Sequence, residues 1–203
     1  MAETMTPRER FMAALQLQPH ERVPLANSLG TVMQWDLAEL DYTWEELFND
    51  SDKLVYLEER CIVEYGNDSL VVPRDVRSEA LGFGSRVVYN LPCGRGFRLP
   101  MVAEWVVSSE KDLSKLRPYD PKKIPAMTLN LEVVARLREK FPDVAIIGLV
   151  NGIGSLHTDV VNDQNKFSGD SHGHFKTLLD NIAKNPKFVH QVLERHTTYG
   201  APA

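Results

Sequence analysis

Two short stretches of the sequence are apolar at nearly every position. One is Leu70-Val71-Val72-Pro73, and the other runs from Val144 to Val150. A strand with one face in water alternates apolar and polar residues, whereas a strand of a parallel sheet is covered by helices on both faces and is apolar throughout. Both stretches are therefore predicted to be strands of a parallel sheet, which makes the expected fold class α/β.

A third strand and the intervening helices complete this pattern. Residues 22–26 are short and apolar, although Pro24 lacks the N–H that the interior of a strand donates. Helices are predicted where apolar residues recur every three to four positions, and the first begins at a capping box of Thr6 and Glu9. The predicted helices cover residues 7–18, 31–50, 52–66 and 127–141. Helices that alternate with strands favour right-handed crossover units, here about three of them.

Residues 83–107 follow a different, two-residue period that is typical of exposed strands. Arg86–Tyr89 and Met101–Val107 flank the turn-rich segment Pro92-Cys93-Gly94-Arg95-Gly96. This region is predicted to be a β-hairpin excursion from the α/β pattern.

The rest of the chain is predicted to be helical. A short helix begins at a second capping box, made by Ser109 and Asp112, and two more helices are expected at residues 174–184 and 186–196. Since neither a repeat nor a long linker interrupts the sequence, residues 1–203 are expected to form a single domain.

The composition argues against several classes of protein. Acidic residues outnumber basic ones, 28 to 23, so the net charge of −5 supplies no basic field for nucleic acid or anionic lipid. No apolar run approaches the roughly 20 residues that cross a membrane. The first ten residues mix charges of both signs, and a cytoplasmic protein is expected. Cys61 and Cys93 form no CxxC pair and are expected to be reduced thiols.

The segment Asp68–Asp75, followed by Glu79-Ala80-Leu81-Gly82, resembles the second barrel strand of the uroporphyrinogen decarboxylase family. This superfamily also contains the corrinoid-dependent methyltransferases. Other segments resemble the family in the same order along the chain: Thr6–Arg10, Ala13–Leu15, Arg22–Pro24, Asp112–Leu116, Ile146–Gly148 and Asn185–Glu194. The resemblance therefore spans nearly the whole chain and rests on the shared order of these motifs.

The resemblance implies a TIM (β/α)₈ barrel with its active site at the carboxyl ends of the strands. The chain contains about three of the βα units, so we expect the N-terminal portion of such a barrel, an incomplete domain over residues 1–203. A sheet of three parallel strands cannot close, and its last strand exposes unpaired main-chain groups. A missing C-terminal half or self-association is therefore expected.

The resemblance also implies where the active site lies. Asp75 matches the catalytic aspartate of the decarboxylases, whose charge stabilises positive charge that develops on the substrate. The turn after the last predicted strand contributes the expected substrate-binding residues, because main-chain N–H groups at the start of a helix can bind an anion. These residues are Asn151, Gly152, Gly154, Ser155 and the nearby His157.

Two enzymatic functions compete. The decarboxylases carry an arginine-rich segment after the first strand that binds substrate carboxylates, but this chain has Asn27-Ser28-Leu29-Gly30-Thr31 there. Transfer of a methyl group from a methyl-corrinoid to a thiol or similar acceptor is therefore favoured. Alternatives are a uroporphyrinogen decarboxylase-type lyase in porphyrin biosynthesis and a catalytically silent half-barrel that acts as an assembly partner.

The methyltransferase branch implies a zinc ion that activates the thiol and a corrinoid-carrying partner protein. Its His-x-Cys and Cys ligands belong to the second half of the barrel, so no cofactor is expected on this chain. His172-Gly173-His174 lacks a third ligand at suitable spacing, and no metal site is predicted from it. The expected partners are a small-molecule substrate and the corrinoid protein, without nucleic acid or membrane.

Overall fold

The computed structural model describes residues 4–26, 31–72, 77–89, 92–93, 96–97, 100–161 and 173–200. The chain divides into two compact units. The first contains residues 1–75, 92–98 and 125–150, and the second contains residues 76–91, 99–124 and 151–203.

A parallel pair of strands forms the centre of the first unit. β1 (Ser69–Val72) pairs with β6 (Ala145–Gly148) in a register that runs from Ser69–Ala145 to Val72–Gly148. On the other side of β1, Ala26 forms an isolated parallel bridge with Ser69. The parallel direction of the three apolar segments is thus confirmed, although the predicted strand 22–26 is reduced to this single bridge.

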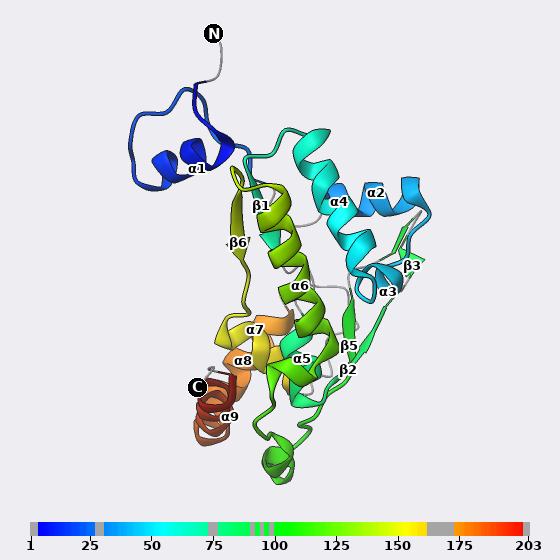
Figure 1. Ribbon diagram of the computed structural model, residues 1–203. Coiled ribbons are helices and arrows are strands. Elements are labelled where there is room, and N and C mark those ends of the chain that lie inside the picture. Colours follow the sequence, from blue (N-terminus) through cyan, green and yellow to red (C-terminus); the bar gives the residue numbers. More distant parts are fainter. Residues whose placement is uncertain are drawn as a thin grey trace. The chain divides into compact units, whose positions relative to one another are not determined.

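The first unit also contains the helices α1 (Pro7–Leu15), α2 (Thr31–Leu40), α3 (Trp44–Leu47), α4 (Ser51–Val63) and α6 (Pro125–Lys140). Of these, α1, α4 and α6 contact the parallel sheet. Figure 1 shows α4 and α6 running side by side, and both contact β1. The apolar period predicts a buried stripe on α4 made by Leu54, Leu57, Cys61, Ile62 and Tyr65. The first three are fully buried, whereas Ile62 is half-buried and Tyr65 is 39% exposed, so the stripe is confirmed over most of its length.

The buried face of α6 differs from the prediction. The apolar period places Met127, Leu131, Val134, Leu137 and Phe141 on one side of this helix. Leu137 is buried and Met127, Val134 and Phe141 are half-buried as this predicts, but Leu131 is 63% exposed, and Asn130 and Val133 are buried instead. The predicted face is therefore confirmed in part, and the buried face is shifted by about one residue around the helix.

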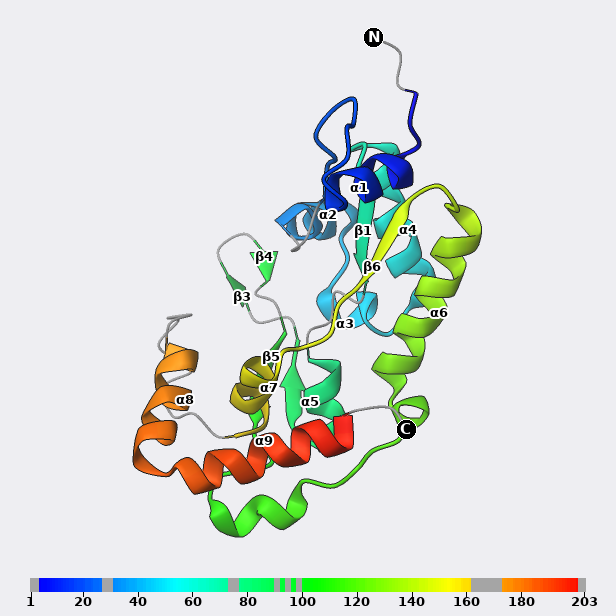
Figure 2. The ribbon, with the colours of Figure 1, turned by 90° about the vertical axis from the view of Figure 1, so that its left-hand side faces the viewer.

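An ion-pair cluster lies at the amino ends of the strands, where Figure 2 shows α1 beside β1 and β6. Asp68, which is buried, accepts hydrogen bonds from Arg10 Nη1, from Arg22 Nη1 at 2.6 Å and from the main-chain N–H of Leu25 at 2.7 Å. Arg10 is fully buried and also pairs with Glu21 at 2.6 Å. The main-chain N–H of Thr4 and the Arg10 guanidinium lower the pKa of Glu21 to about 2. These bonds join the first helix and the segment before Ala26 to the central strand.

The hairpin excursion is confirmed as two antiparallel pairs. β2 (Arg86–Val88) pairs with β5 (Met101–Glu104) in the second unit, and β3 (Pro92–Cys93) pairs with β4 (Gly96–Phe97) in the first unit. The strand predicted over residues 101–107 ends at Glu104, and Val107 instead forms a parallel bridge with Val161.

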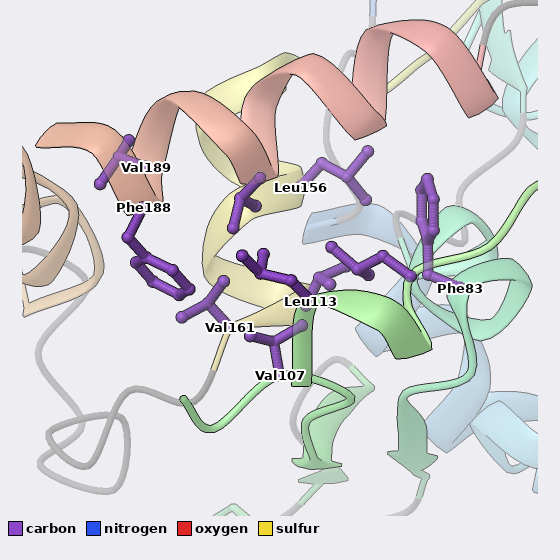
Figure 3. Packing of buried hydrophobic residues seen from close by; sticks show 10 residues of the cluster. Phe83, Val107, Leu113, Leu156, Val161, Phe188 and Val189 are labelled. Carbon is purple, nitrogen blue, oxygen red and sulfur yellow. The ribbon is translucent and has the colours of Figure 1, made fainter. Parts of the chain in front are cut away.

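The second unit is mostly helical. It contains α5 (Ser78–Phe83), the 3₁₀ helices η1 (Glu110–Lys115) and η2 (Pro121–Lys123), α7 (Ile153–Val160), α8 (Gly173–Lys184) and α9 (Pro186–Gly200). Its core, drawn in Figure 3, joins α5, η1, α7 and α9 through these buried residues: Phe83, Val107, Leu113, Leu116, Leu156, Val160, Val161, Phe188, Val189 and Val192. In the described ranges, no helix combines the length and the apolar character that crossing a membrane requires.

Candidate functional site

The carboxyl ends of β1 and β6 meet at one edge of the sheet in the first unit. Val72 pairs with Gly148, and the main-chain N–H of Leu149 donates to the Val72 carbonyl at 3.0 Å. The chain therefore leaves both strands at the same edge, which is where α/β proteins place their ligands. Asp75, the predicted catalytic residue, lies outside the described residues.

In the second unit, Asn151 is hydrogen-bonded to Glu79, a residue of α5 (Ser78–Phe83). The Glu79 carboxylate accepts the main-chain N–H of Asn151 at 3.2 Å and its side-chain Nδ2 at 3.0 Å. Both residues are half-buried. Asn151 was predicted from the sequence, whereas Glu79 entered only as part of a family motif. A carboxylate that accepts both donors of one asparagine fixes the direction of that side chain and of the adjoining main chain.

The predicted glycine turn forms the beginning of α7. Gly152 is the N-cap residue and its carbonyl accepts the main-chain N–H of Leu156 at 3.0 Å. Gly152 and Ser155 are exposed, and Gly154 is half-buried. A Cβ at Gly152 would meet no described atom within 4 Å, so a small side chain fits at this position. The turn thus presents its start to solvent while Asn151 anchors it.

A second link joins α7 to the residue that precedes α5. Arg77 Nη1 lies 2.6 Å from Asp159 Oδ2, and Asp159 is buried. Arg77 Nε also donates to the Pro100 carbonyl at 3.2 Å, and the Ser85 hydroxyl donates to the Asp159 carbonyl at 3.0 Å. Neither Arg77 nor Asp159 was predicted from the sequence. The sequence offers one signal for this link, because Arg77 follows the predicted catalytic Asp75 by two positions.

His157 is buried, with an exposed fraction of 2%. It lies near His196 of α9, whose exposed fraction is 3% and whose ring packs against Phe83 at 5.0 Å between centroids. Burial, together with the neighbouring His157, lowers the pKa of His196 to about 4. The two imidazoles thus belong to the apolar core of the second unit in this structure, and a contact between His157 and substrate stays a prediction.

The donors for a metal are sparse in the described part of the chain. No group of three His, Cys, Asp or Glu side chains there is placed to hold a metal ion. Cys61 is buried on α4, as expected for a structural thiol. Cys93 lies in β3, His174 lies in α8, and His172 lies outside the described residues. The described side chains alone do not fit the zinc site that the resemblance implies for complete methyltransferases.

Comparison with known proteins gives a consistent result at the level of family and fold. The family model of uroporphyrinogen decarboxylase (URO-D) matches residues 6–201. The chain is similar to a methyltransferase structure from Methanosarcina mazei, with a TM-score of 0.73 and 22% identity, over 96% of this chain and 53% of that chain. This structural likeness supports the fold, an α/β architecture with a parallel sheet.

Two curated relatives are more specific. The methylcobamide:CoM methyltransferases MtbA of Methanosarcina acetivorans and of Methanosarcina mazei are each 30% identical to this chain, over 169 and 173 residues. Each alignment covers 81% of this chain and 48% of the relative. The chain therefore spans about half the length of the curated relatives that it matches.

Proposed function

The chain belongs to the uroporphyrinogen decarboxylase family, and from this premise we propose that it is part of an enzyme that transfers a methyl group from a methylated corrinoid to a thiol. The observation that carries the proposal is its 30% identity with two methylcobamide:CoM methyltransferases over 81% of its length. Since the match covers about half of each relative, the complete activity is proposed for this chain together with a second half.

The proposed reaction is a nucleophilic displacement. The thiol gives its proton to water, its sulfur forms a bond to the methyl carbon, and the carbon–cobalt bond breaks with both electrons left on the corrinoid. The residues that the structure describes do not fit a zinc site, so the proposal assigns no step to a metal on this part of the chain. The part proposed for this chain is to position the acceptor and to stabilise the charge that develops during transfer.

We assign substrate positioning to the turn that begins at Asn151. An acceptor such as CoM carries an anionic group as well as its thiol, and main-chain N–H groups at the first turn of α7 suit an anion. The double hydrogen bond from Asn151 to Glu79 supports this role, because it holds the entrance of the turn in one conformation. Gly152 and Ser155 are exposed at the same turn, and Gly154 is half-buried.

Asp75 is the proposed catalytic residue. It follows β1 by three positions in the sequence, and the described chain leaves β1 and β6 at one edge of the sheet. A fixed carboxylate is most effective where positive charge develops and water is excluded, and in this reaction that charge develops on the methyl carbon. The resemblance implies the same electrostatic role for the matching aspartate of the decarboxylases.

A reconstituted assay tests the proposal. The chain is mixed with the C-terminal half of the M. acetivorans relative, methylcobalamin, zinc and 2-mercaptoethanesulfonate, and the cobalamin absorbance is followed. We expect thiol-dependent demethylation, lowered about 100-fold by Asp75→Asn and unchanged by Asp143→Asn, which alters an exposed carboxylate in the turn before β6.

The alternatives give different outcomes in the same assay. No absorbance change from a mixture in which the two halves bind would refute methyl transfer. Decarboxylation of a uroporphyrinogen by this mixture would assign the chain to the lyase branch. Binding of the two halves without either reaction would indicate a catalytically silent assembly partner.

A further inference from the structure

The turn that begins α7 starts with a chemically reactive dipeptide. Asn151-Gly152 is the one Asn-Gly pair in the 203-residue sequence. In such a pair the main-chain nitrogen of the glycine can attack the side-chain carbonyl carbon of the asparagine, because glycine has no Cβ that hinders the close approach. Asparagine is accordingly one of the chemically labile residues of proteins.

The surroundings of Gly152 leave its nitrogen available for this attack. Gly152 is exposed, and within the described residues its main-chain N–H donates no hydrogen bond. Gly152 is also the N-cap residue of α7, and the partial positive charge of a helix N-terminus favours negative charge nearby. This position therefore stabilises the deprotonated nitrogen that makes the attack.

The contact with α5 opposes the same reaction. The Glu79 carboxylate accepts the side-chain Nδ2 of Asn151 at 3.0 Å and the main-chain N–H of Asn151 at 3.2 Å. A carboxamide that is held by its nitrogen has fewer conformations in which its carbon can be attacked. The charge of Glu79 also disfavours negative charge on the neighbouring main-chain nitrogen. Glu79 is thus placed to slow the reaction of Asn151.

We propose that Asn151 is a deamidation site that Glu79 protects. In the first step the Gly152 nitrogen forms a bond to the carboxamide carbon of Asn151, the bond from this carbon to Nδ2 breaks, and ammonia leaves with the proton of the Gly152 N–H. Water then opens the succinimide ring, and a carboxylate replaces the carboxamide, as aspartate or isoaspartate, while its proton goes to water. Water is the one co-reactant.

Deamidation reverses the contact with α5. Asn151 donates to Glu79 from Nδ2, whereas a carboxylate at position 151 has no side-chain donor and carries the same charge as Glu79. Two carboxylates at hydrogen-bonding distance disfavour each other's charged form. The modification therefore releases the start of α7 from α5 and cannot be reversed by the protein itself. The proposal concerns the chemistry of the chain and holds whether or not the chain takes part in methyl transfer.

Peptide mass spectrometry tests the reaction. The folded chain is incubated in mildly alkaline buffer, and conversion of amide to acid is followed in the peptide that contains Asn151. We expect deamidation there, slowed about tenfold by Gly152→Ala and accelerated about fivefold by Glu79→Ala. Alanine is accommodated at position 152, because its Cβ would meet no described atom within 4 Å.

Asn185 provides a matched control in the same chain. Its Nδ2 also donates to a carboxylate, that of Glu110, but it precedes Pro186, which has no N–H to attack with. Glu110→Ala should therefore leave Asn185 unmodified, although it removes the same kind of contact. In urea, the unchanged chain and Glu79→Ala should deamidate at equal rates, since the protection depends on the folded contact.

Reciprocal substitutions test the structural consequence. Asn151→Asp places the carboxylate of the product in the turn and should accelerate amide hydrogen exchange at the start of α7 about tenfold. Adding Glu79→Gln supplies a side-chain donor opposite this carboxylate, so the double variant should recover most of the protection. Circular dichroism checks that Glu79→Ala stays folded, and Glu79→Gln replaces it in the mass measurement if it does not.

Three outcomes would overturn the proposal. They are no deamidation of Asn151 in either the unchanged chain or the Glu79 variant, equal rates in these two folded proteins, and unchanged hydrogen exchange of α7 in Asn151→Asp.

Discussion

The carboxylate of Glu79 holds Asn151 by two hydrogen bonds, although the two residues are 72 positions apart in the sequence. Glu79 lies in the first turn of α5, and Asn151 directly precedes the glycine that caps α7. One side chain thus sets the geometry of the turn to which we assign substrate positioning.

We expect Glu79→Ala to lower the free energy of unfolding by about 1–2 kcal/mol, because two donors lose a charged acceptor. In the reconstituted assay it should raise the KM for the thiol more than it lowers kcat. Urea unfolding followed by circular dichroism gives the first quantity. Glu139→Ala, on an exposed carboxylate of α6, serves as the control with a change within about 0.5 kcal/mol. Equal effects of both substitutions would show that the Asn151 contact is unimportant.

Asp68→Asn should lower the free energy of unfolding far more than Glu79→Ala does. The substitution leaves Arg10 buried beside a neutral side chain, and loss of one partner of a buried ion pair costs about 3–5 kcal/mol. Asp143→Asn, at an exposed position, should change the free energy of unfolding by less than about 0.5 kcal/mol. Glu21→Gln, which neutralises the more exposed of the two carboxylates that pair with Arg10, is expected to cost less than Asp68→Asn. A Glu21 variant less stable than Asp68→Asn would contradict this explanation.

The second unit should become less stable in mild acid. His196 has a pKa of about 4 when folded and an ordinary value of 6.5, so the unfolded chain binds more protons between these pH values. The free energy of unfolding is therefore not reduced by this group above about pH 6.5, and it decreases as the pH falls toward 4. This group alone should lower the free energy of unfolding by about 2 kcal/mol from pH 7 to pH 5.

Amide hydrogen exchange of α9 peptides at the two pH values measures this effect. His196→Phe should remove most of the difference, because the aromatic ring still packs against Phe83 but takes up no proton. His190→Phe, on an exposed position of the same helix, should leave it unchanged. An acid effect that persists in the His196 variant would have to come from other groups.

Gly82 is packed tightly against an aromatic ring. A Cβ at this position would lie 2.7 Å from the Tyr119 ring, which itself packs edge-on against Phe83. Gly82→Ala is therefore expected to destabilise the protein by about 1–3 kcal/mol. Gly152→Ala, where a Cβ meets nothing within 4 Å, is the matched control. Thermal unfolding distinguishes the two, and combining Gly82→Ala with Tyr119→Leu should relieve the clash.

Much of the local structure was predictable because its causes lie within a few residues of each other. The capping boxes of Thr6 and Ser109 and the buried stripe of α4 are present as expected. The apolar runs of β1 and β6 indicated a parallel sheet, because only strands covered on both faces can be apolar throughout. The order of the motifs was sufficient to identify the family.

The orientation of α6 and the charge contacts were not predictable in this way. Leu131 faces outward and Asn130 inward because a whole helix surface is fitted against α4 and β1, and the apolar period defines that surface only to within a residue. Glu79 and Arg77 were unremarkable charges in the sequence until the fold placed Asn151 and Asp159 beside them.

Residue order along the chain was thus enough for most of the secondary structure, the direction of the strands and the family. Tertiary structure alone decided which polar side chains meet, namely Arg10 with Asp68, Arg77 with Asp159 and Glu79 with Asn151. The reason is physical. A helix cap or an apolar stripe depends on neighbours within one or two turns, whereas an ion pair depends on where the packed core brings distant segments, and many pairings of the same charges are compatible with one sequence.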